Sequence, residues 1–352
     1  MEIALVGLPG SGKTSLFAAL SGQTDVTPSH RIHEPLVATI SVPDERLELL
    51  RDHYSPRKFT PASLIVLDYP GFPVDDAAEG KARFVATIRE ADAFAVVLSA
   101  FTRPGEGAAA DPSSERQRLL EEFALGDIVL VERRIERLEK DTKRPSKTRD
   151  DDLRELAVLQ RILPALFDGK TILDLGLSAG EERLLRGFRF LTAKPRLIVV
   201  NQAEGADPAS ASHVAESGEA WVALAATVER ELAAISDPAE LAECMEMMGV
   251  TETARPRLLS AAYATLGLSS FFTVGEDEVR AWTIPAGCPA VEAAGKVHSD
   301  IQRGFIRAEV VSYEDYTAAG SMKEAKARNR MRLEGKDYAV ADGDIINFRF
   351  SV

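Results

Sequence analysis

The chain has 352 residues, of which 45% are hydrophobic and 28% charged, a composition that excludes global disorder and predicts a globular protein of two or three domains. Its formal net charge of −13 argues against a surface that attracts nucleic acid everywhere, although a local basic face is compatible with it. Because the two cysteines are far apart and neither a basic leader nor a long apolar run is found, we expect a cytoplasmic protein with no membrane association.

The first predicted element is a strand over residues 3–6, and an amphipathic helix is predicted from Thr14 onward. Between them, residues 7–14 read GLPGSGKT and fit the phosphate-binding pattern G-x-x-x-x-G-K-[ST]. Glycines in such a loop let backbone N–H groups turn toward phosphates, while Lys13 reaches the β- and γ-phosphates and Thr14 binds Mg²⁺. The predicted nucleotide-binding residues of this loop are Gly7, Pro9, Gly10, Ser11, Gly12, Lys13, Thr14 and Ser15. The alternative is a glycine-rich turn with an exposed lysine.

Apolar runs at residues 64–67, 94–98, 197–200 and 221–224 predict further strands. They show little alternation, which is typical of strands covered on both faces in a parallel α/β sheet. Such sheets bind ligands at the carboxyl ends of their strands. We therefore expect the loops that follow these runs, at 68–71, 201–204 and 225–227, to converge on the phosphate loop.

Asp68 and Gly71 form a D-x-x-G element directly after one predicted strand. The carboxylate of Asp68 is predicted to hold Mg²⁺, and the N–H of Gly71 to approach the γ-phosphate, so both join Lys13 as predicted catalytic residues. Phe72 follows, where Ras-like enzymes carry a glutamine that orients the attacking water. A phenyl ring cannot orient water, and we interpret Phe72 as a packing residue.

Asn201, Gln202 and Glu204 stand where GTPases place N-K-x-D, the motif that reads guanine. Glutamate is one methylene longer than aspartate, which weakens the match to two guanine N–H groups, while amide and backbone groups complement adenine. This loop is therefore predicted to bind the base, with ATP preferred over GTP. The alternative for Glu204 is a solvated loop acid.

Between residues 113 and 189, apolar residues recur at helical spacing within a dense background of charge. The repeats are Ile128, Val131, Ile135 and Leu138, then Leu153, Leu156, Leu159, Leu163 and Leu166. A break at residues 143–147 separates them, which predicts an antiparallel coiled-coil hairpin. The alternative is an extra helical layer packed on the sheet.

Short β-type segments at residues 271–274, 279–284, 304–311 and 345–350 predict a small α+β module at the end of the chain. A basic segment lies inside it, with cationic residues Lys323, Lys326, Arg328, Arg330, Arg332 and Lys336. This segment is either a contact for phosphate backbone or an ordinary solvated surface.

These motifs, with the segments RAWT at 280–283, GFIRAEV at 304–310 and RLEGKDY at 332–338, resemble the YchF family of Obg-related P-loop NTPases over nearly the whole chain. The resemblance implies an α/β P-loop domain at 1–112 and 190–267, a helical coiled-coil insertion at 113–189 and a β-grasp TGS domain at 268–352. It also implies Mg²⁺-dependent hydrolysis of ATP in preference to GTP, with adenine read by Asn201 and the backbone of Gln202 and backed by the loop of Ala225 and Ala226. Contact with ribosomes or their RNA is implied through the TGS and coiled-coil surfaces. We expect a monomer.

The chain also departs from the family pattern. Gly10 replaces a common asparagine that could support a monovalent cation, so dependence on such a cation stays open. Ile32 stands where a threonine would meet Mg²⁺, Thr39 is interpreted as a strand residue, and no catalytic role is expected for His30 or His33. Slow ATP hydrolysis is therefore the leading hypothesis, and a non-hydrolysing nucleotide-dependent adaptor, a GTP-preferring enzyme and a small-molecule kinase are the alternatives.

Overall fold

The computed structural model describes residues 1–23, 26–27, 31, 34–73, 78–103, 105, 107–143, 145, 147–216 and 218–351. The chain divides into one unit of Met1–Ala38 and Ile65–Arg257 and a second unit of Thr39–Leu64 and Leu258–Val352. Ile32, His30 and His33 lie outside the described residues. No helix in the described part of the chain is long and apolar enough to cross a membrane.

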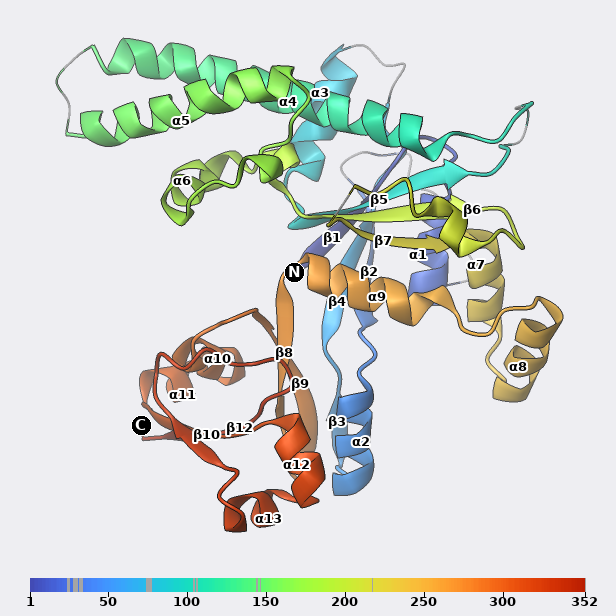
Figure 1. Cartoon of the computed structure of the whole chain (residues 1–352), viewed down its shortest axis with the longest axis vertical. Helices are drawn as coiled ribbons and strands as arrows, with labels where there is room; N and C mark the ends of the chain where they lie inside the picture. The colour runs from blue at the N-terminus through green and yellow to red at the C-terminus, as the bar shows by residue number, and fades with distance from the viewer. Residues whose placement is uncertain are drawn as a thin grey trace. The chain divides into compact units, whose positions relative to one another are not determined.

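The first unit is built on a sheet with the strand order β2-β4-β1-β5-β6-β7 (Figure 1). Its strands are β1 (Glu2–Val6), β2 (Leu36–Ser41), β4 (Ser63–Asp68), β5 (Ala93–Ala100), β6 (Arg196–Gln202) and β7 (Ala220–Leu224). The pairs β1–β4, β1–β5, β5–β6 and β6–β7 are all parallel, which confirms the strands and the parallel sheet predicted from the apolar runs. Thr39 lies within β2, as interpreted from the sequence.

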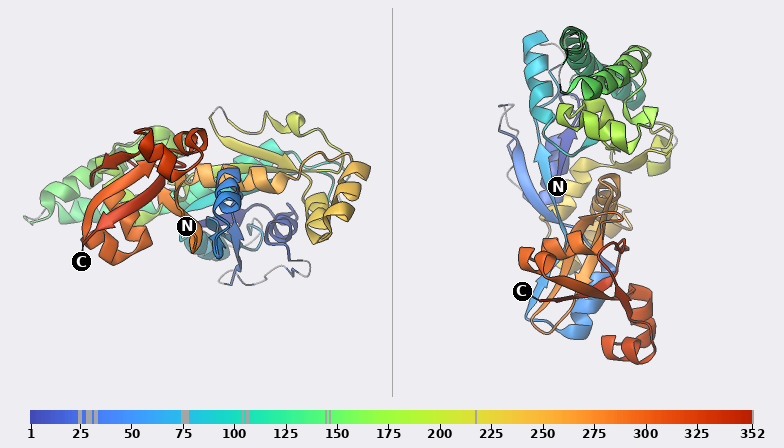
Figure 2. Two further views of the ribbon diagram at one scale, coloured as in Figure 1. Left: turned by 90° about the horizontal axis from the view of Figure 1, so that it is seen from below. Right: turned by 90° about the vertical axis from the view of Figure 1, so that its left-hand side faces the viewer.

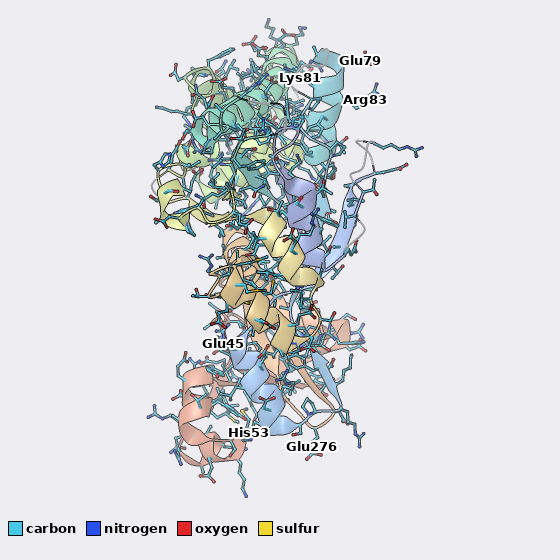
Figure 3. All side chains as sticks on the ribbon, turned by 90° about the vertical axis from the view of Figure 1, so that its right-hand side faces the viewer. Glu45, His53, Glu79, Lys81, Arg83 and Glu276 are labelled. Carbon is cyan, nitrogen blue, oxygen red and sulfur yellow. The ribbon has the colours of Figure 1, made fainter. Side chains whose placement is uncertain are left out.

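Helices α3 and α4 pack apolar side chains against this sheet. The helices and short 3-10 turns of this part of the chain are α1 (Lys13–Ser21), α3 (Ala78–Ile88), α4 (Pro112–Asp141), α5 (Arg149–Phe167), η1 (Leu173–Leu175), α6 (Ala179–Leu185), η2 (Arg186–Phe188), η3 (Leu191–Ala193), η4 (Pro208–Ala211), α7 (Ala226–Ala234), α8 (Pro238–Met247) and α9 (Ala254–Thr265), of which α9 runs across the division between the units. Phe84 of α3 and Phe123 of α4 are buried in one core with strand residues such as Phe94. Figure 3 labels Glu79, Lys81 and Arg83 on α3; Glu79 and Arg83 are exposed, whereas Lys81 pairs with Glu122 of α4 over 2.5 Å.

Helix α4 combines the two arrangements considered from the sequence. Its first half contributes Leu119 and Phe123 to the core on the sheet, as an added helical layer does. Its second half lies side by side with α5, and Figures 1 and 2 show the two as a hairpin. A bidentate ion pair joins Arg134 to Glu155, with distances of 2.6 and 2.8 Å.

Most residues of the predicted apolar repeat pack in the seam between α4 and α5. The buried seam residues are Ile128, Val131, Leu138, Val158, Leu159, Ile162 and Leu166. The expectation for Leu153 is wrong, because this side chain is 41% exposed. Leu153 precedes Leu159 by six positions, which turns it about 120° away from the seam.

The second unit contains a sheet with the order β11-β10-β12-β8-β9-β3. Its strands are β3 (Lys58–Thr60), β8 (Leu268–Thr273), β9 (Glu278–Pro285), β10 (Phe305–Val311), β11 (Arg332–Glu334) and β12 (Ile345–Phe350), and its helices are α2 (Glu45–Tyr54), α10 (Ala290–Val297), α11 (Ser299–Arg303), α12 (Tyr313–Ala319) and α13 (Met322–Ala327). Phe271 and Phe348 meet edge to face in its core, with ring centroids 5.8 Å apart. Figure 3 labels Glu45 and His53 at opposite ends of α2.

Four strands of this sheet, β8, β9, β10 and β12, were predicted from the sequence and are confirmed. Strands β3 and β11 were not predicted. β3 pairs in parallel with β9, from Lys58 opposite Glu278 to Thr60 opposite Arg280. Residues 39–64 therefore belong to the same unit as the end of the chain.

Candidate nucleotide site

The phosphate loop connects the end of β1 to the start of α1, as its sequence requires. Gly12 has φ +90°, a left-handed conformation that side chains other than glycine rarely adopt. A Cβ atom on Gly12 would also lie 2.1 Å from Nδ2 of Asn201. Glycine is therefore needed here both for the turn and for the close approach of the loop after β6.

Lys13 is buried at the first position of α1, with 5% of its surface exposed. Its Nζ donates hydrogen bonds of 3.1 Å to the carbonyl oxygens of Gly7 and Leu8. Burial lowers the pKa of Lys13 to about 8, although the carboxylates of Asp68 and Glu115 favour its charged form. The Lys13 ammonium thus lies inside the phosphate loop with its burial only partly offset by nearby carboxylates.

Thr14 and Asp68 meet beside this lysine. The Thr14 hydroxyl donates to Oδ2 of Asp68 over 2.8 Å, while Oδ1 of Asp68 is buried without a hydrogen-bond partner. Burial also raises the pKa of Asp68, against the effects of Thr14 and Lys13. One hydroxyl and one carboxylate with an unsatisfied oxygen are hard oxygen ligands that suit Mg²⁺, which takes few ligands from protein when phosphates supply the others. The residues present therefore fit the predicted metal position.

Gly71 lies directly against the phosphate loop. A Cβ atom here would stand 2.7 Å from the backbone N and Cα of Pro9. The next residue, Phe72, donates its backbone N–H to the carbonyl oxygen of Gly7 over 2.9 Å. Its side chain is buried and meets the ring of Phe84 edge to face at 5.2 Å, which confirms Phe72 as a packing residue.

Asn201 ties three loops together through the two ends of its amide. Nδ2 donates to the carbonyl oxygen of Ser11 over 3.0 Å, and Oδ1 accepts from the backbone N–H of Ala226 over 2.9 Å. The predicted convergence of the loops after β1, β6 and β7 is confirmed by these bonds. Each end of the amide thereby makes one hydrogen bond within the protein.

The other predicted base-binding residues lie around this junction. Gln202 turns its side chain into its own loop, where Nε2 donates to Ser210 Oγ over 3.0 Å and to the Asp207 carbonyl oxygen over 3.2 Å. Glu204 is exposed in the turn that follows β6, and Ala225 directly precedes α7. The structure therefore brings Ala226 to the phosphate loop and leaves the carboxylate of Glu204 in solvent.

Arg103 and Glu115 also reach the phosphate loop, and no sequence motif marked them. Nη2 of Arg103 donates to Ser99 Oγ over 2.8 Å and to the carboxylate of Glu115. Glu115 is buried in the first turn of α4 and accepts from the backbone N–H of Ser99 over 2.9 Å. Burial raises the pKa of Glu115, and Arg103 opposes that rise. The sequence held one indication that Arg103 belongs to the site, since it follows the carboxyl end of a predicted strand, now β5.

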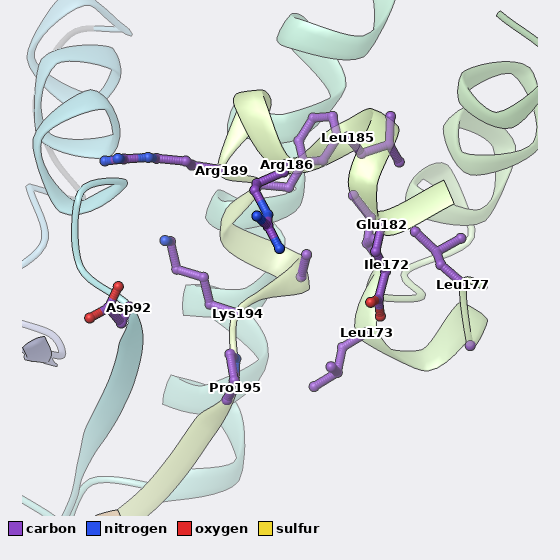
Figure 4. Close-up of a pocket in the computed structure, with 13 residues that line it drawn as sticks. Asp92, Ile172, Leu173, Leu177, Glu182, Leu185, Arg186, Arg189, Lys194 and Pro195 are labelled. Carbon is purple, nitrogen blue, oxygen red and sulfur yellow. The ribbon is translucent and has the colours of Figure 1, made fainter. Parts of the chain in front are cut away.

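A separate cavity of about 350 Å³ lies at the opposite edge of the sheet (Figure 4). Asp92 and Pro195, which line it, directly precede β5 and β6, so the cavity is at the amino ends of these strands. Figure 4 shows Leu173 and Leu177 on its other side. This cavity is therefore not the nucleotide site.

Two protein-family models match this chain, one near its beginning and one at its end. A family model described as 50S ribosome-binding GTPase matches residues 2–134, and the YchF-GTPase_C model, described as a protein of unknown function (DUF933), matches residues 268–351. Curated relatives named ribosome-binding ATPase YchF include one from Bacillus subtilis, 36% identical, and one from Haemophilus influenzae, 35% identical. Each alignment covers 100% of this chain, with 100% and 99% of the respective relatives.

A solved structure agrees as well. The YchF GTPase of Schizosaccharomyces pombe has 26% sequence identity and a TM-score of 0.85, over 99% of this chain and 97% of that one. The predicted α/β P-loop fold is therefore confirmed. The curated relatives are named as ATPases and the yeast protein as a GTPase, so the names do not agree on the nucleotide.

Proposed function

The chain belongs to the YchF family, and from this premise we propose that it is a Mg²⁺-dependent nucleotide switch that prefers ATP and hydrolyses its β–γ phosphoanhydride slowly. The observation that carries the proposal is the group formed by the phosphate loop, buried Lys13 and the Thr14–Asp68 pair. Each of these groups has the charge or the hydrogen-bonding capacity that a triphosphate with a divalent ion requires.

The residues of the loop act mainly by binding and orienting. Lys13 neutralises charge on the β- and γ-phosphates, and backbone N–H groups between Gly10 and Thr14 hold the phosphate oxygens. Thr14 and Asp68 would hold Mg²⁺, which neutralises phosphate charge when bound. Gly71 lies against Pro9 of the loop, and we assign its backbone N–H to a hydrogen bond with the γ-phosphate. Loss of that contact after hydrolysis would release the segment after β4, which is how the nucleotide state acts as a switch.

The preference for ATP rests on the loop after β6. Glu204 is solvent-exposed and Gln202 replaces the lysine of the GTPase motif, so the two-point carboxylate contact to guanine is weakened. We assign Asn201 to holding the loops, and we assign adenine contacts to the backbone at Gln202 and to the segment of Ala225 and Ala226. The names of the curated relatives support ATP.

A ribosomal partner is proposed from the same relatives and from exposed basic residues. Lys323, Lys326 and Lys336 are exposed around α13 and β11. Arg328 and Arg330 already make contacts within their own module. Arg328 donates to the carbonyl oxygen of Ala318, and Arg330 pairs with Asp315 at 3.5 Å. We propose that the lysines, in a TGS-type module, and the hairpin surface contact ribosomal RNA. A cytoplasmic monomer is consistent with this role.

The partner is tested by co-sedimentation with purified ribosomes over a range of salt concentrations. The double variant Lys323→Glu/Lys326→Glu is expected to sediment less than wild type, with a shallower salt dependence because fewer phosphate contacts are made. The matched control is Arg183→Glu/Arg186→Glu, which makes the same charge change at exposed residues of α6 and η2. Equal sedimentation of wild type and the lysine variant would remove these lysines from the interface.

Phe72 supports a second candidate function, a nucleotide-dependent adaptor that does not hydrolyse. Its side chain is buried, and it stands where a glutamine would orient water. Single-turnover hydrolysis of radiolabelled ATP distinguishes the two. The proposed enzyme forms Mg²⁺-dependent ADP above the level of a Lys13→Met variant, whereas the adaptor binds ATP and forms none above that level.

A further inference from the structure

Arg103 lies across the phosphate loop at a position where the loop has no side chain. If Gly10 carried a Cβ atom, it would stand 3.3 Å from Cδ of Arg103 and 3.5 Å from Nε. Gly10 has φ +75°, within the left-handed region. The glycine therefore lets the guanidinium end of Arg103 approach the loop backbone.

The Arg103 guanidinium is held in this place by groups from two elements. Ser99 near the end of β5 accepts from Nη2 over 2.8 Å, and Glu115 in the first turn of α4 accepts from the same nitrogen. Glu115 is itself fixed, since it is buried and also accepts from the backbone N–H of Ser99. An arginine oriented in this way loses little further side-chain freedom when it meets a ligand.

We propose that Arg103 is a phosphate-contacting residue of the hydrolysis reaction, a cation supplied by the chain itself that neutralises the terminal phosphates of ATP across Gly10. The inference deepens the proposed function and rests on it. A guanidinium can bind a carboxylate along one edge and a phosphate oxygen along another, so Glu115 can orient Arg103 while Arg103 binds ATP. Phosphoryl transfer is accelerated by an arginine acting in cis, because charge on the transferred group must be stabilised. A fixed guanidinium beside Gly10 also makes a monovalent metal ion unnecessary at that position.

The test compares wild type with Arg103→Ala, Arg103→Lys and Arg118→Ala under saturating Mg²⁺ and ATP. Arg118 is an exposed arginine of α4 and serves as the control. We expect Arg103→Ala to lower the turnover number at least about tenfold, Arg103→Lys to recover part of it, and Arg118→Ala to leave it unchanged. Free guanidinium ion at millimolar concentration should restore part of the Arg103→Ala rate, which a purely structural role would not allow. Wild type should turn over equally in sodium and potassium salts.

Gly10→Asn is a second variant that keeps the Arg103–Glu115 pair but places a side chain in the contact. Asparagine tolerates the left-handed conformation, so the loop can fold, and the same loss of turnover is expected in sodium salts, where no potassium is present for this asparagine to hold. Unchanged turnover in both Arg103→Ala and Gly10→Asn, or a wild-type rate that depends on potassium, would overturn the proposal.

Measuring the affinity for ATPγS tests the phosphate contact of Arg103 independently of whether the protein hydrolyses ATP. If wild type binds ATPγS without hydrolysing ATP, the proposed enzyme is wrong, and a fall of at least about fivefold in ATPγS affinity for Arg103→Ala would still support the phosphate contact. Equal ATPγS affinities for the two proteins would then reject it. If wild type binds no nucleotide, both proposals fail.

Discussion

Thr14 and Asp68, 54 positions apart in the sequence, are joined by a hydrogen bond of 2.8 Å from the threonine hydroxyl to Oδ2 of the aspartate. The bond connects the first turn of α1 to the end of strand β4, which pairs in parallel with β1. Oδ1 of Asp68 remains buried without a partner, and so does Oγ of Ser11 in the phosphate loop. Two unsatisfied polar atoms close to a buried lysine cost free energy in folding, which indicates that the loop is built for a polar ligand.

Replacing Asp68 with asparagine tests this pair as a metal site. The amide oxygen can still accept from Thr14, but the carboxylate charge is lost, so the Mg²⁺ concentration for half-maximal ATP binding should rise roughly 10–100-fold. Fluorescence titration of Mg²⁺ at fixed nucleotide measures the shift. Asp92→Asn, at the amino end of β5, should leave the titration unchanged. An unaltered Mg²⁺ requirement in Asp68→Asn would remove Asp68 from the metal site.

Replacing Lys13 with methionine should stabilise the nucleotide-free protein while abolishing ATP binding. Burial lowers the pKa of Lys13 from 10.5 to about 8, so the ionised side chain costs stability in the folded state, by about 1–3 kcal/mol below pH 8. The cost is present below pH 8 and disappears as the pH rises from about 8 toward 10.5, because the lysine then loses its proton in the folded state first. Urea unfolding should show Lys13→Met more stable at pH 7, with a smaller difference at pH 10. A less stable variant at pH 7 would contradict this account.

The same pKa predicts that ATP binding takes up a proton under mildly alkaline conditions. Lys13 is half-ionised near pH 8 in the free protein, and a bound triphosphate favours its charged form. Calorimetry of ATP binding at pH 8.5 in two buffers of different ionisation enthalpy measures the uptake. The affinity should fall about tenfold between pH 7 and pH 9. No proton uptake and no loss of affinity across this range would show that Lys13 does not titrate at the site.

Much of the site could be predicted because its signals are local or follow from one rule of topology. The segment from Gly7 to Thr14 carries its own turn chemistry, and Asp68 and Asn201 both follow apolar strands. Parallel pairing then brings the ends of those strands together, as the bonds from Asn201 to the phosphate loop and to Ala226 confirm. The four main strands of the terminal sheet could likewise be read from aromatic and β-branched residues.

Other features depend on contacts that a linear pattern does not specify. The three residues of β3 are recognisable only by their pairing with β9, more than two hundred positions later. The bond from Arg103 to Glu115 depends on how α4 begins beside the end of β5. The side-chain direction of Asn201 follows from the close approach of Gly12, which no spacing in the sequence reveals.

Asn201→Ala distinguishes a residue that holds loops from one that reads the base. Loss of two buried hydrogen bonds should lower the free energy of unfolding by about 1–3 kcal/mol and weaken nucleotide binding. Because the amide is engaged with the protein, the affinities for ATP and GTP should fall by the same factor. Competition binding with both nucleotides measures this, and Asn347→Ala, which loses a hydrogen bond to Glu309 in the second unit, is the control. A change confined to the ATP-to-GTP ratio would show that Asn201 contacts the base.

Isothermal titration calorimetry of the purified chain with Mg²⁺ and ATP or GTP tests the central claim most directly. We predict saturable heat with ATP, a weaker isotherm with GTP, and no saturable heat with either nucleotide in Lys13→Met. If folded wild-type protein gave no saturable heat with ATP or GTP, the account of a nucleotide switch would be contradicted.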